Sequence, residues 1–191
     1  AGMAQLYASS QQAAGALSGD GLAAVPTAIN HISCDALFER PVQAELVELL
    51  LLPREDRSFT SCVLVHGMGG TGKTVTVVAA VQHSAVRRYY REIYWLTVGA
   101  DAVGERISQL QATLFKQMTG KGMKGEEKDD NERQAMLVAA MTEKQRGLVV
   151  LDDPWMTEQV RYLNPIDSSQ SDHRLLITTR IRDPVSYTHL R

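Results

Sequence analysis

Four glycines, a methionine, a lysine and two threonines make up one short stretch of the chain, which reads Gly67, Met68, Gly69, Gly70, Thr71, Gly72, Lys73 and Thr74. Glycines permit positive φ angles and close backbone approach, so successive N–H groups can point inward and bind an anion. The lysine adds a mobile positive charge, and the Thr74 hydroxyl is placed to ligate Mg²⁺. The order and spacing fit G-x-x-x-x-G-K-[ST], the pattern of a loop that binds nucleotide phosphates.

The segments around this loop support the same interpretation. The apolar run 62–65 predicts a strand that leads into the loop, and residues 74–89 predict a helix that follows it. The β-branched residues of that helix argue weakly against it, but the motif outweighs their low propensity. The strand–loop–helix context distinguishes a phosphate-binding loop from the alternative, a glycine-rich turn with an incidental lysine. The sequence therefore predicts that the chain binds a nucleotide.

Two further groups of residues complete the predicted site. The apolar run 148–151 predicts a buried strand that ends in Asp152 and Asp153. Open α/β sheets bind ligands at the carboxyl ends of their strands, so Asp152 would hold Mg²⁺ and Asp153 would orient or deprotonate a water molecule. Arg180 follows a predicted strand over 175–178. It would sense the γ-phosphate or stabilise transferred charge, the alternative being a surface arginine at a strand end.

The remaining elements give the fold class and the domain limits. The patterns predict a strand over 93–98 and helices over 41–52, 103–118, 132–144 and 157–163. Strands that alternate with helices in this way favour an α/β fold with a doubly wound, mostly parallel sheet flanked by helices. We expect residues 1–34 to be a flexible lead-in, residues 35–183 to be the nucleotide-binding domain and residues 184–191 to be a tail of uncertain origin.

Composition limits the partners and the compartment. The 191-residue chain is 44% apolar and carries a formal net charge of −2, which gives no electrostatic case for nucleic acid or membrane as the main partner. The basic cluster over 87–91 reads as a solvated helix end rather than a binding surface. Cys34 and Cys62 form no disulfide framework, so we expect a reducing, cytoplasmic compartment.

Taken in order, the motifs resemble those of the NB-ARC family of signal-transducing ATPase domains. The similarity covers about residues 36–182 and is carried by three segments, 66–74, 148–155 and 175–180. Asp-Asp-x-Trp and Thr-Thr-Arg are its most specific features, and Pro154 stands where the family usually has an aliphatic residue. The resemblance implies a P-loop NTPase fold with strand order 5-1-4-3-2, the strand before Arg180 lying between the loop strand and the acidic strand, and the fifth strand missing here. It also implies that Arg180 senses the γ-phosphate.

A weaker part of the resemblance lies upstream of the loop. Phe38 and Arg40 fall where the family has residues that help to hold adenine, although Glu39 replaces its glycine and Pro41 the acid that often follows. From the residues alone, Phe38 is equally well explained as a core anchor for the helix that begins near Pro41.

The resemblance implies a regulatory switch that binds ADP and ATP with Mg²⁺ and hydrolyses ATP slowly or negligibly. It further implies homo-oligomerisation of the full-length protein and protein signalling partners. The alternative is a turnover ATPase or a small-molecule kinase that uses the same loop. A kinase usually has an arginine-rich lid, for which the only candidates are Arg161, Arg174, Arg180 and Arg182. A DNA-dependent ATPase is disfavoured by the acidic balance.

Overall fold

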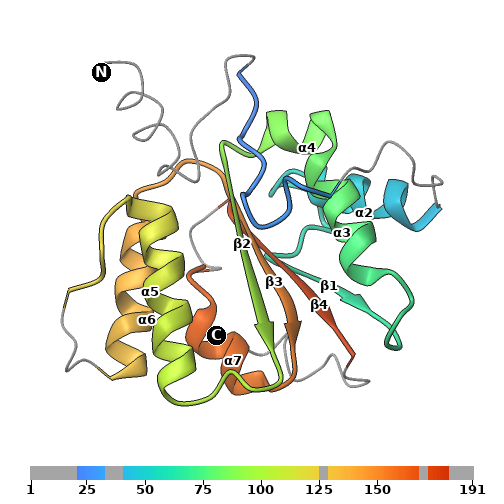
Figure 1. Ribbon diagram of the computed structural model, residues 1–191. Coiled ribbons are helices and arrows are strands. Elements are labelled where there is room, and N and C mark those ends of the chain that lie inside the picture. Colours follow the sequence, from blue (N-terminus) through green and yellow to red (C-terminus); the bar gives the residue numbers. More distant parts are fainter. Residues whose placement is uncertain (1–20, 33–40, 125–128, 168–171, 181–191) are drawn as a thin grey trace, which may run out of the picture.

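The computed structural model describes residues 21–32, 41–124, 129–167 and 172–180 (Figure 1). Within these ranges one four-stranded sheet is present, and every neighbouring pair of strands is parallel. Its strands are β1 (Cys62–His66), β2 (Glu92–Gly99), β3 (Gly147–Pro154) and β4 (Arg174–Thr179). The fold is α/β, which confirms the class predicted from alternating strands and helices.

The strand order places the acidic strand and the loop strand on either side of β4. The order is β1-β4-β3-β2, so the strand that precedes Arg180 occupies its predicted central position. The register aligns His66 with Thr179, and Asp152 with Thr178. Since all the strands are parallel, their carboxyl ends lie at one edge of the sheet, where ligands bind in folds of this kind.

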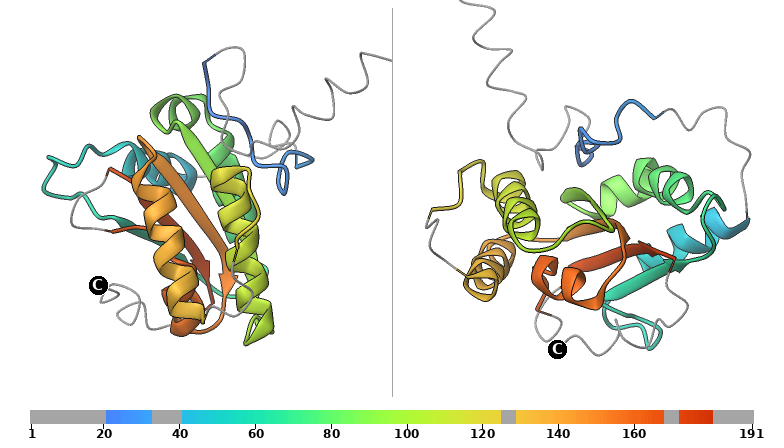
Figure 2. Two further views of the ribbon diagram at one scale, coloured as in Figure 1. Left: turned by 90° about the vertical axis from the view of Figure 1, so that its left-hand side faces the viewer. Right: turned by 60° about the horizontal axis from the view of Figure 1, so that its bottom comes forward.

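Helices cover both faces of the sheet (Figures 1 and 2). Strand β3 explains this arrangement, because Leu148 and Val150 pack into one core cluster whereas Val149 and Leu151 pack into the other. The first cluster includes α2 (Pro41–Leu51), α3 (Lys73–Gln82) and α4 (Ser84–Tyr89). The second includes α5 (Glu105–Thr119), α6 (Asp130–Thr142) and α7 (Thr157–Leu163).

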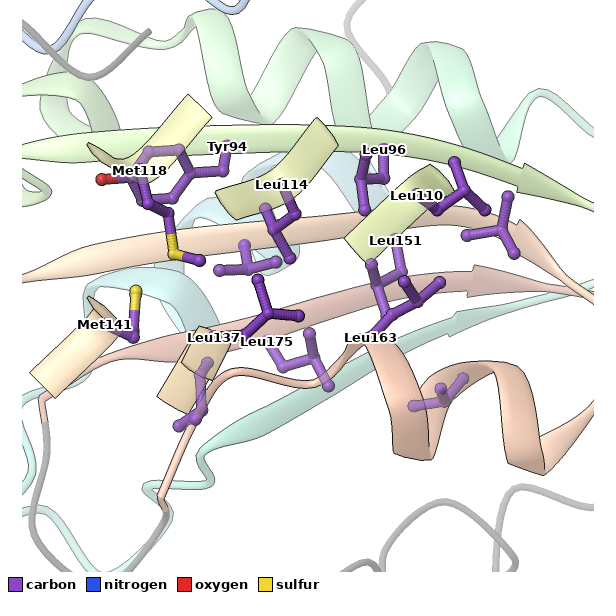
Figure 3. Packing of buried hydrophobic residues seen from close by; sticks show 14 of the residues in the cluster. Tyr94, Leu96, Leu110, Leu114, Met118, Leu137, Met141, Leu151, Leu163 and Leu175 are labelled. Atoms are coloured by element: carbon purple, nitrogen blue, oxygen red, sulfur yellow. The ribbon is translucent and has the colours of Figure 1, made fainter. Parts of the chain in front are cut away.

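Figure 3 shows how the second cluster fills the space between the sheet and its helices. Helix α5 contributes Ile107, Leu110, Leu114 and Met118, which recur at helical spacing and are all at most 5% exposed. Each such side chain contributes roughly 1.5–3 kcal/mol when fully buried. This packing fixes β2 and β3 against the helices, and thereby fixes where the acidic residues at the end of β3 lie.

The predicted single helix over residues 74–89 is wrong. The chain leaves helical geometry at His83, whose φ of −60° and ψ of 131° are extended, and this residue separates α3 from α4. The His83 ring nitrogen Nδ1 accepts a hydrogen bond of 3.2 Å from Ala85 N, so the start of α4 has a side-chain cap. The β-branched residues that argued against a long helix lie in α3, which ends at Gln82 after ten residues.

The remaining helices begin close to their predicted positions. Helix α6 begins at Asp130, earlier than predicted, because Asp129 and Glu132 form a reciprocal capping box. No helix in the described ranges is long and apolar enough to cross a membrane.

Part of the expected lead-in packs against the domain. In residues 21–32, Ala23 and Ile29 are buried, and Ala23 N donates a hydrogen bond of 2.8 Å to Arg87 O. Gln82 of α3 holds the same segment, because its side chain donates to Ile32 O over 2.8 Å. Residues 1–20, 33–34 and 184–191 lie outside the described residues.

Candidate functional site

The glycine-rich loop connects the end of β1 to the start of α3. Gly70 and Gly72 have φ angles of 78° and 84°, in the left-handed region that a residue with a Cβ atom rarely adopts. Gly72 caps α3, which begins at Lys73, so the positive end of the helix faces the loop. Gly67 N donates to Thr179 O over 3.3 Å, which joins the loop to the end of β4. The loop therefore lies beside the central strand, with the amino end of α3 facing it.

The Lys73 side chain runs back along the loop. Its Nζ donates to Gly67 O over 2.7 Å and to Met68 O over 2.9 Å. Thr71 Oγ1 also donates to Met68 O, over 2.9 Å. A Cβ atom added at Gly67 would lie 3.2 Å from Thr71 Oγ1, so a larger residue would crowd this turn. The loop thus holds its ammonium group close to the backbone groups that would surround a phosphate.

The loop and the acidic strand meet at Asp152. Its Oδ1 accepts hydrogen bonds from Thr74 Oγ1 over 2.8 Å and from Thr178 Oγ1 over 2.6 Å, and the residue is only 6% exposed. These contacts bring together residues that are 78 positions apart in the chain. A buried carboxylate is costly unless it is hydrogen-bonded, and the two hydroxyl groups provide that compensation.

The donor set at this point suits Mg²⁺. Thr74 and Asp152 supply hard oxygen atoms, the ligand type that Mg²⁺ prefers. No group of three or more His, Cys, Asp or Glu side chains that could hold a metal ion occurs in the described part of the chain. A magnesium ion here would therefore need phosphate oxygens and water to complete its coordination.

Asp153 turns away from Asp152 towards Arg180. Its φ of 57° is the one positive value at a non-glycine residue in the described ranges, and its N donates to Thr178 Oγ1 over 2.9 Å. Arg180 Nε and Nη2 donate to the two Asp153 carboxylate oxygens over 3.0 and 3.2 Å. Trp155 Nε1 donates to Asp153 Oδ2 over 3.2 Å. Both oxygens of the candidate base are therefore hydrogen-bonded.

Arg180 lies beside the phosphate loop as well as beside Asp153. A Cβ atom added at Gly69 would lie 3.2 Å from Arg180 Nη1. The guanidinium carbon is 5.3 Å from the centroid of the Trp155 ring, and 48% of the Arg180 side chain is exposed. The arginine therefore has one face towards the loop, another towards an aromatic ring and enough solvent access to move.

The structure brings the predicted phosphate loop, both aspartates and Arg180 together at one edge of the sheet. Phe38 and Arg40, the predicted adenine-side pair, lie outside the described residues, as does Arg182. Arg174 is at the amino end of β4, the opposite end from Arg180, so it cannot belong to a lid over the loop.

Sequence reasoning missed two residues that organise the site. Thr178 joins both aspartates; the Thr-Thr-Arg motif included it, but the sequence assigned it no role. Gln159 is 1% exposed and fixes the turn after β3, since its Oε1 accepts from Trp155 N over 2.7 Å. Its Nε2 donates to Gly99 O and Ala102 O, over 3.1 and 3.0 Å. A glutamine in a short helix carries no pattern that would reveal this role.

Comparison with known proteins identifies the family. The profile of the NB-ARC domain matches residues 42–189. The disease resistance protein RPM1 of Arabidopsis thaliana is 27% identical over 173 residues, which are 84% of this chain and 18% of that protein. The probable disease resistance protein RXW24L of the same plant is 29% identical over 133 residues, or 68% of this chain and 14% of that protein. The disease resistance protein RGA2 of Solanum bulbocastanum is 27% identical over 140 residues, or 72% and 14%.

The chain thus spans less than a fifth of the length of these relatives. The profile match covers most of the chain and includes the loop, the aspartate pair and Arg180. With the site geometry above, it shows that the chain belongs to the NB-ARC domain family and is a nucleotide-binding signalling module.

Proposed function

We propose that this domain is an adenine-nucleotide switch that binds ADP in one state and ATP in another, with slow or negligible hydrolysis. The observation that carries the proposal is the position of Arg180, which lies against Gly69 of the loop. Its guanidinium is bound to the Asp153 carboxylate, which a phosphate group could replace. A switch requires a group whose interactions differ between its two ligands. An arginine near the loop is such a group, because only ATP has a γ-phosphate for it to contact.

Each predicted residue has a role in this proposal. The loop amides and Lys73 bind the phosphates, Thr74 and Asp152 ligate Mg²⁺, and Arg180 contacts the γ-phosphate. Mg²⁺ would supply charge neutralisation at the phosphate oxygens. Phe38 and Arg40 are proposed for the adenine side, on the resemblance alone.

Slow hydrolysis is implied by the family resemblance, and the environment of Asp153 is consistent with it as long as Arg180 stays on this carboxylate. A general base needs a free carboxylate oxygen within hydrogen-bonding distance of a water molecule. Both oxygens of Asp153 already accept hydrogen bonds, from Arg180 and Trp155. This supports a switch over the alternative, a turnover ATPase or small-molecule kinase.

The biological setting is proposed from the relatives. Their names describe plant disease resistance proteins, so we propose that this domain serves in a protein of that kind. In the full-length protein, ATP binding would favour homo-oligomerisation and contact with signalling partners in the cytoplasm. Neither nucleic acid nor a membrane is proposed as a partner.

Calorimetry with ADP and with a non-hydrolysable ATP analogue, both with Mg²⁺, tests the switch. We expect both nucleotides to bind, and we expect Arg180→Ala to weaken the ATP analogue about tenfold more than ADP. Phosphate release should remain below about 1 s⁻¹, the lower end of typical enzyme turnover. Equal losses for the two nucleotides, or multiple turnover at enzyme rates, would contradict the proposal.

A further inference from the structure

Arg180 is held from two sides by residues at the end of β3. Asp153 binds its guanidinium through both carboxylate oxygens, and the Trp155 ring lies on it with the centroid 5.3 Å from the guanidinium carbon. Trp155 also donates its indole N–H to Asp153 Oδ2 over 3.2 Å. The tryptophan therefore contacts both members of the ion pair. We call Asp153 and Trp155 the arginine holder.

The backbone of the holder is fixed by buried contacts. Trp155 N is bonded to Gln159 Oε1, and Gln159 is anchored to two backbone carbonyls at the end of β2. Asp153 N is bonded to Thr178 of β4. The Arg180 guanidinium, by contrast, lies at the end of a long side chain, of which 48% is exposed. If one part moves, it is the arginine side chain that moves.

The ion pair is strong enough to position Arg180 and weak enough to exchange. The Asp153 side chain is 26% exposed, so solvent screens the pair and limits its strength. A guanidinium binds carboxylate and phosphate through the same fork of N–H groups, and cannot give both of them its best bidentate geometry at once. Asp153 and a γ-phosphate beside Gly69 would therefore compete for Arg180.

We propose that the arginine holder sets the preference of this domain for ATP over ADP, and that Trp155 is a positioning residue in it. The inference rests on the proposed function. Hydrogen bonds that keep Arg180 on Asp153 must be given up before the guanidinium binds the γ-phosphate in a bidentate manner, and this lowers the affinity for ATP. ADP has no group that competes for Arg180, so its affinity does not depend on the holder. The holder thus acts on the ratio of the two dissociation constants.

The test measures that ratio by calorimetry with ADP and a non-hydrolysable ATP analogue, for three variants and for the control variant described in the next paragraph. Asp153→Asn removes the charge, and asparagine tolerates the positive φ at this position. It should raise the preference for ATP about fivefold, the upper range for an exposed ion pair. Trp155→Phe keeps an aromatic ring but removes the indole N–H, and should raise the preference about twofold. Arg180→Ala should lower it.

Arg146 supplies a matched control. It also combines an aromatic ring with a carboxylate, because its guanidinium carbon is 4.5 Å from the Tyr89 ring centroid and its Nε is 4.0 Å from Asp172 Oδ2. It precedes β3 and therefore lies at the amino end of the sheet, away from the loop. Arg146→Ala should leave the nucleotide preference unchanged.

Tryptophan fluorescence emission gives a second measurement. If Trp155 had only a structural role, its emission would not differ between the ADP and the ATP-analogue complexes. The chain has two tryptophans, Trp95 in the buried core and Trp155 in the holder. The ATP analogue should change the emission more than ADP does, because it draws the Arg180 cation away from the Trp155 ring. Trp155→Phe and Arg180→Ala should each abolish that difference.

The outcomes separate this inference from the proposed function. An unchanged ratio in Arg180→Ala would overturn the sensing role of Arg180 and the holder with it. A changed ratio in Arg180→Ala together with an unchanged or lowered preference for ATP in Asp153→Asn would overturn the holder alone. If Trp155→Phe had the wild-type ratio of dissociation constants while Asp153→Asn had a raised preference for ATP, then Asp153 alone would position Arg180 and Trp155 would have no part in it.

Discussion

The two ends of β4 carry arginines in opposite environments. Arg174 at the amino end is 1% exposed and donates to Leu49 O and Leu52 O at the end of α2, with the Phe59 ring 4.3 Å from its guanidinium carbon. Arg180, just past the carboxyl end, is about half exposed and is bound by one partly exposed carboxylate and one aromatic side chain.

The difference lies in the partners rather than in the residue type. The last carbonyls of a helix have no partner within the helix, and a cation there satisfies them and complements the helix dipole. Arg174 meets that need, and Tyr90 assists by donating its hydroxyl to Leu50 O over 2.7 Å. These partners are backbone carbonyls of the fold itself, so we expect Arg174 to stay bound to them whether or not a ligand is present. The partner of Arg180 can be replaced by a ligand, which makes that arginine available for function.

Replacing Arg174 should have the largest effect on stability. Arg174→Ala leaves two partly buried carbonyl groups without their donor, so we expect the free energy of unfolding in urea to fall by about 3 kcal/mol. Arg174→Lys should fall between wild type and Arg174→Ala, because lysine keeps the charge without the planar fork. The ratio of ADP to ATP affinity should stay at its wild-type value. A stable Arg174→Ala protein with an altered ratio would reverse the roles of the two arginines.

Lys73→Ala should have the largest effect on nucleotide affinity. Its ammonium group is the cation that the loop holds beside the phosphate turn. We expect ADP and ATP affinities to fall about 100-fold, as for a charge-assisted contact of about 2.7 kcal/mol, with little change in urea stability. Lys116→Ala, an exposed position on α5, is the control and should bind normally. Normal binding by Lys73→Ala would remove the loop from the site.

The two aspartates should separate metal dependence from hydrolysis. Asp152→Asn weakens a proposed Mg²⁺ ligand, so the gain in ATP affinity that Mg²⁺ provides should shrink about tenfold. Asp153→Asn should keep that gain and lose the residual phosphate release. Titrations of the ATP analogue with and without Mg²⁺, alongside single-turnover assays with ATP, distinguish the two. Identical profiles for both variants would refute this division of roles.

The smallest expected effect is a change in stability with pH, which arises from His173 at the amino end of the sheet. Burial lowers the pKa of His173, which is 3% exposed, although the charges of Asp172 and Glu92 oppose the shift. Its Nδ1 accepts from Gly147 N over 2.9 Å and must be unprotonated to do so. The unfolded chain therefore takes up this proton more readily than the folded chain, and stability should fall as the pH drops below about 6.5.

The variant His173→Gln isolates this contribution, because the glutamine carbonyl can still accept a hydrogen bond and does not titrate. Urea unfolding at a series of pH values should show a shallower loss of stability for His173→Gln than for wild type. Parallel curves for the two proteins would exclude His173 as the source.

The sequence predicted the parts of the site that depend on local pattern. The loop of Gly67–Thr74 and the acidic strand end are contiguous motifs, and parallel topology then requires them to share one edge of the sheet. The strand order was implied by the family resemblance, and the structure has it. The adenine-side residues Phe38 and Arg40 remain predictions.

Features that helical and strand periodicity do not encode could not be predicted. The break at His83 depends on a local side-chain cap that competes with helix continuation, and helical periodicity does not show it. Arg174 appeared in the sequence only as a candidate for a lid, and the fold alone reveals that it faces the end of α2. The left-handed backbone of Asp153 is equally invisible, since aspartate is common in many conformations.

The Thr178 hydroxyl gives this site a particular vulnerability. It is a donor to the carboxylate of Asp152 and an acceptor for the main chain of Asp153. Serine would preserve both bonds, whereas valine, of nearly the same shape, would remove both at once. A substitution at position 178 that changes the hydrogen bond to one aspartate therefore also changes the hydrogen bond to the other. Replacing the hydroxyl by a methyl group, as in Thr178→Val, would disable both functions in one step.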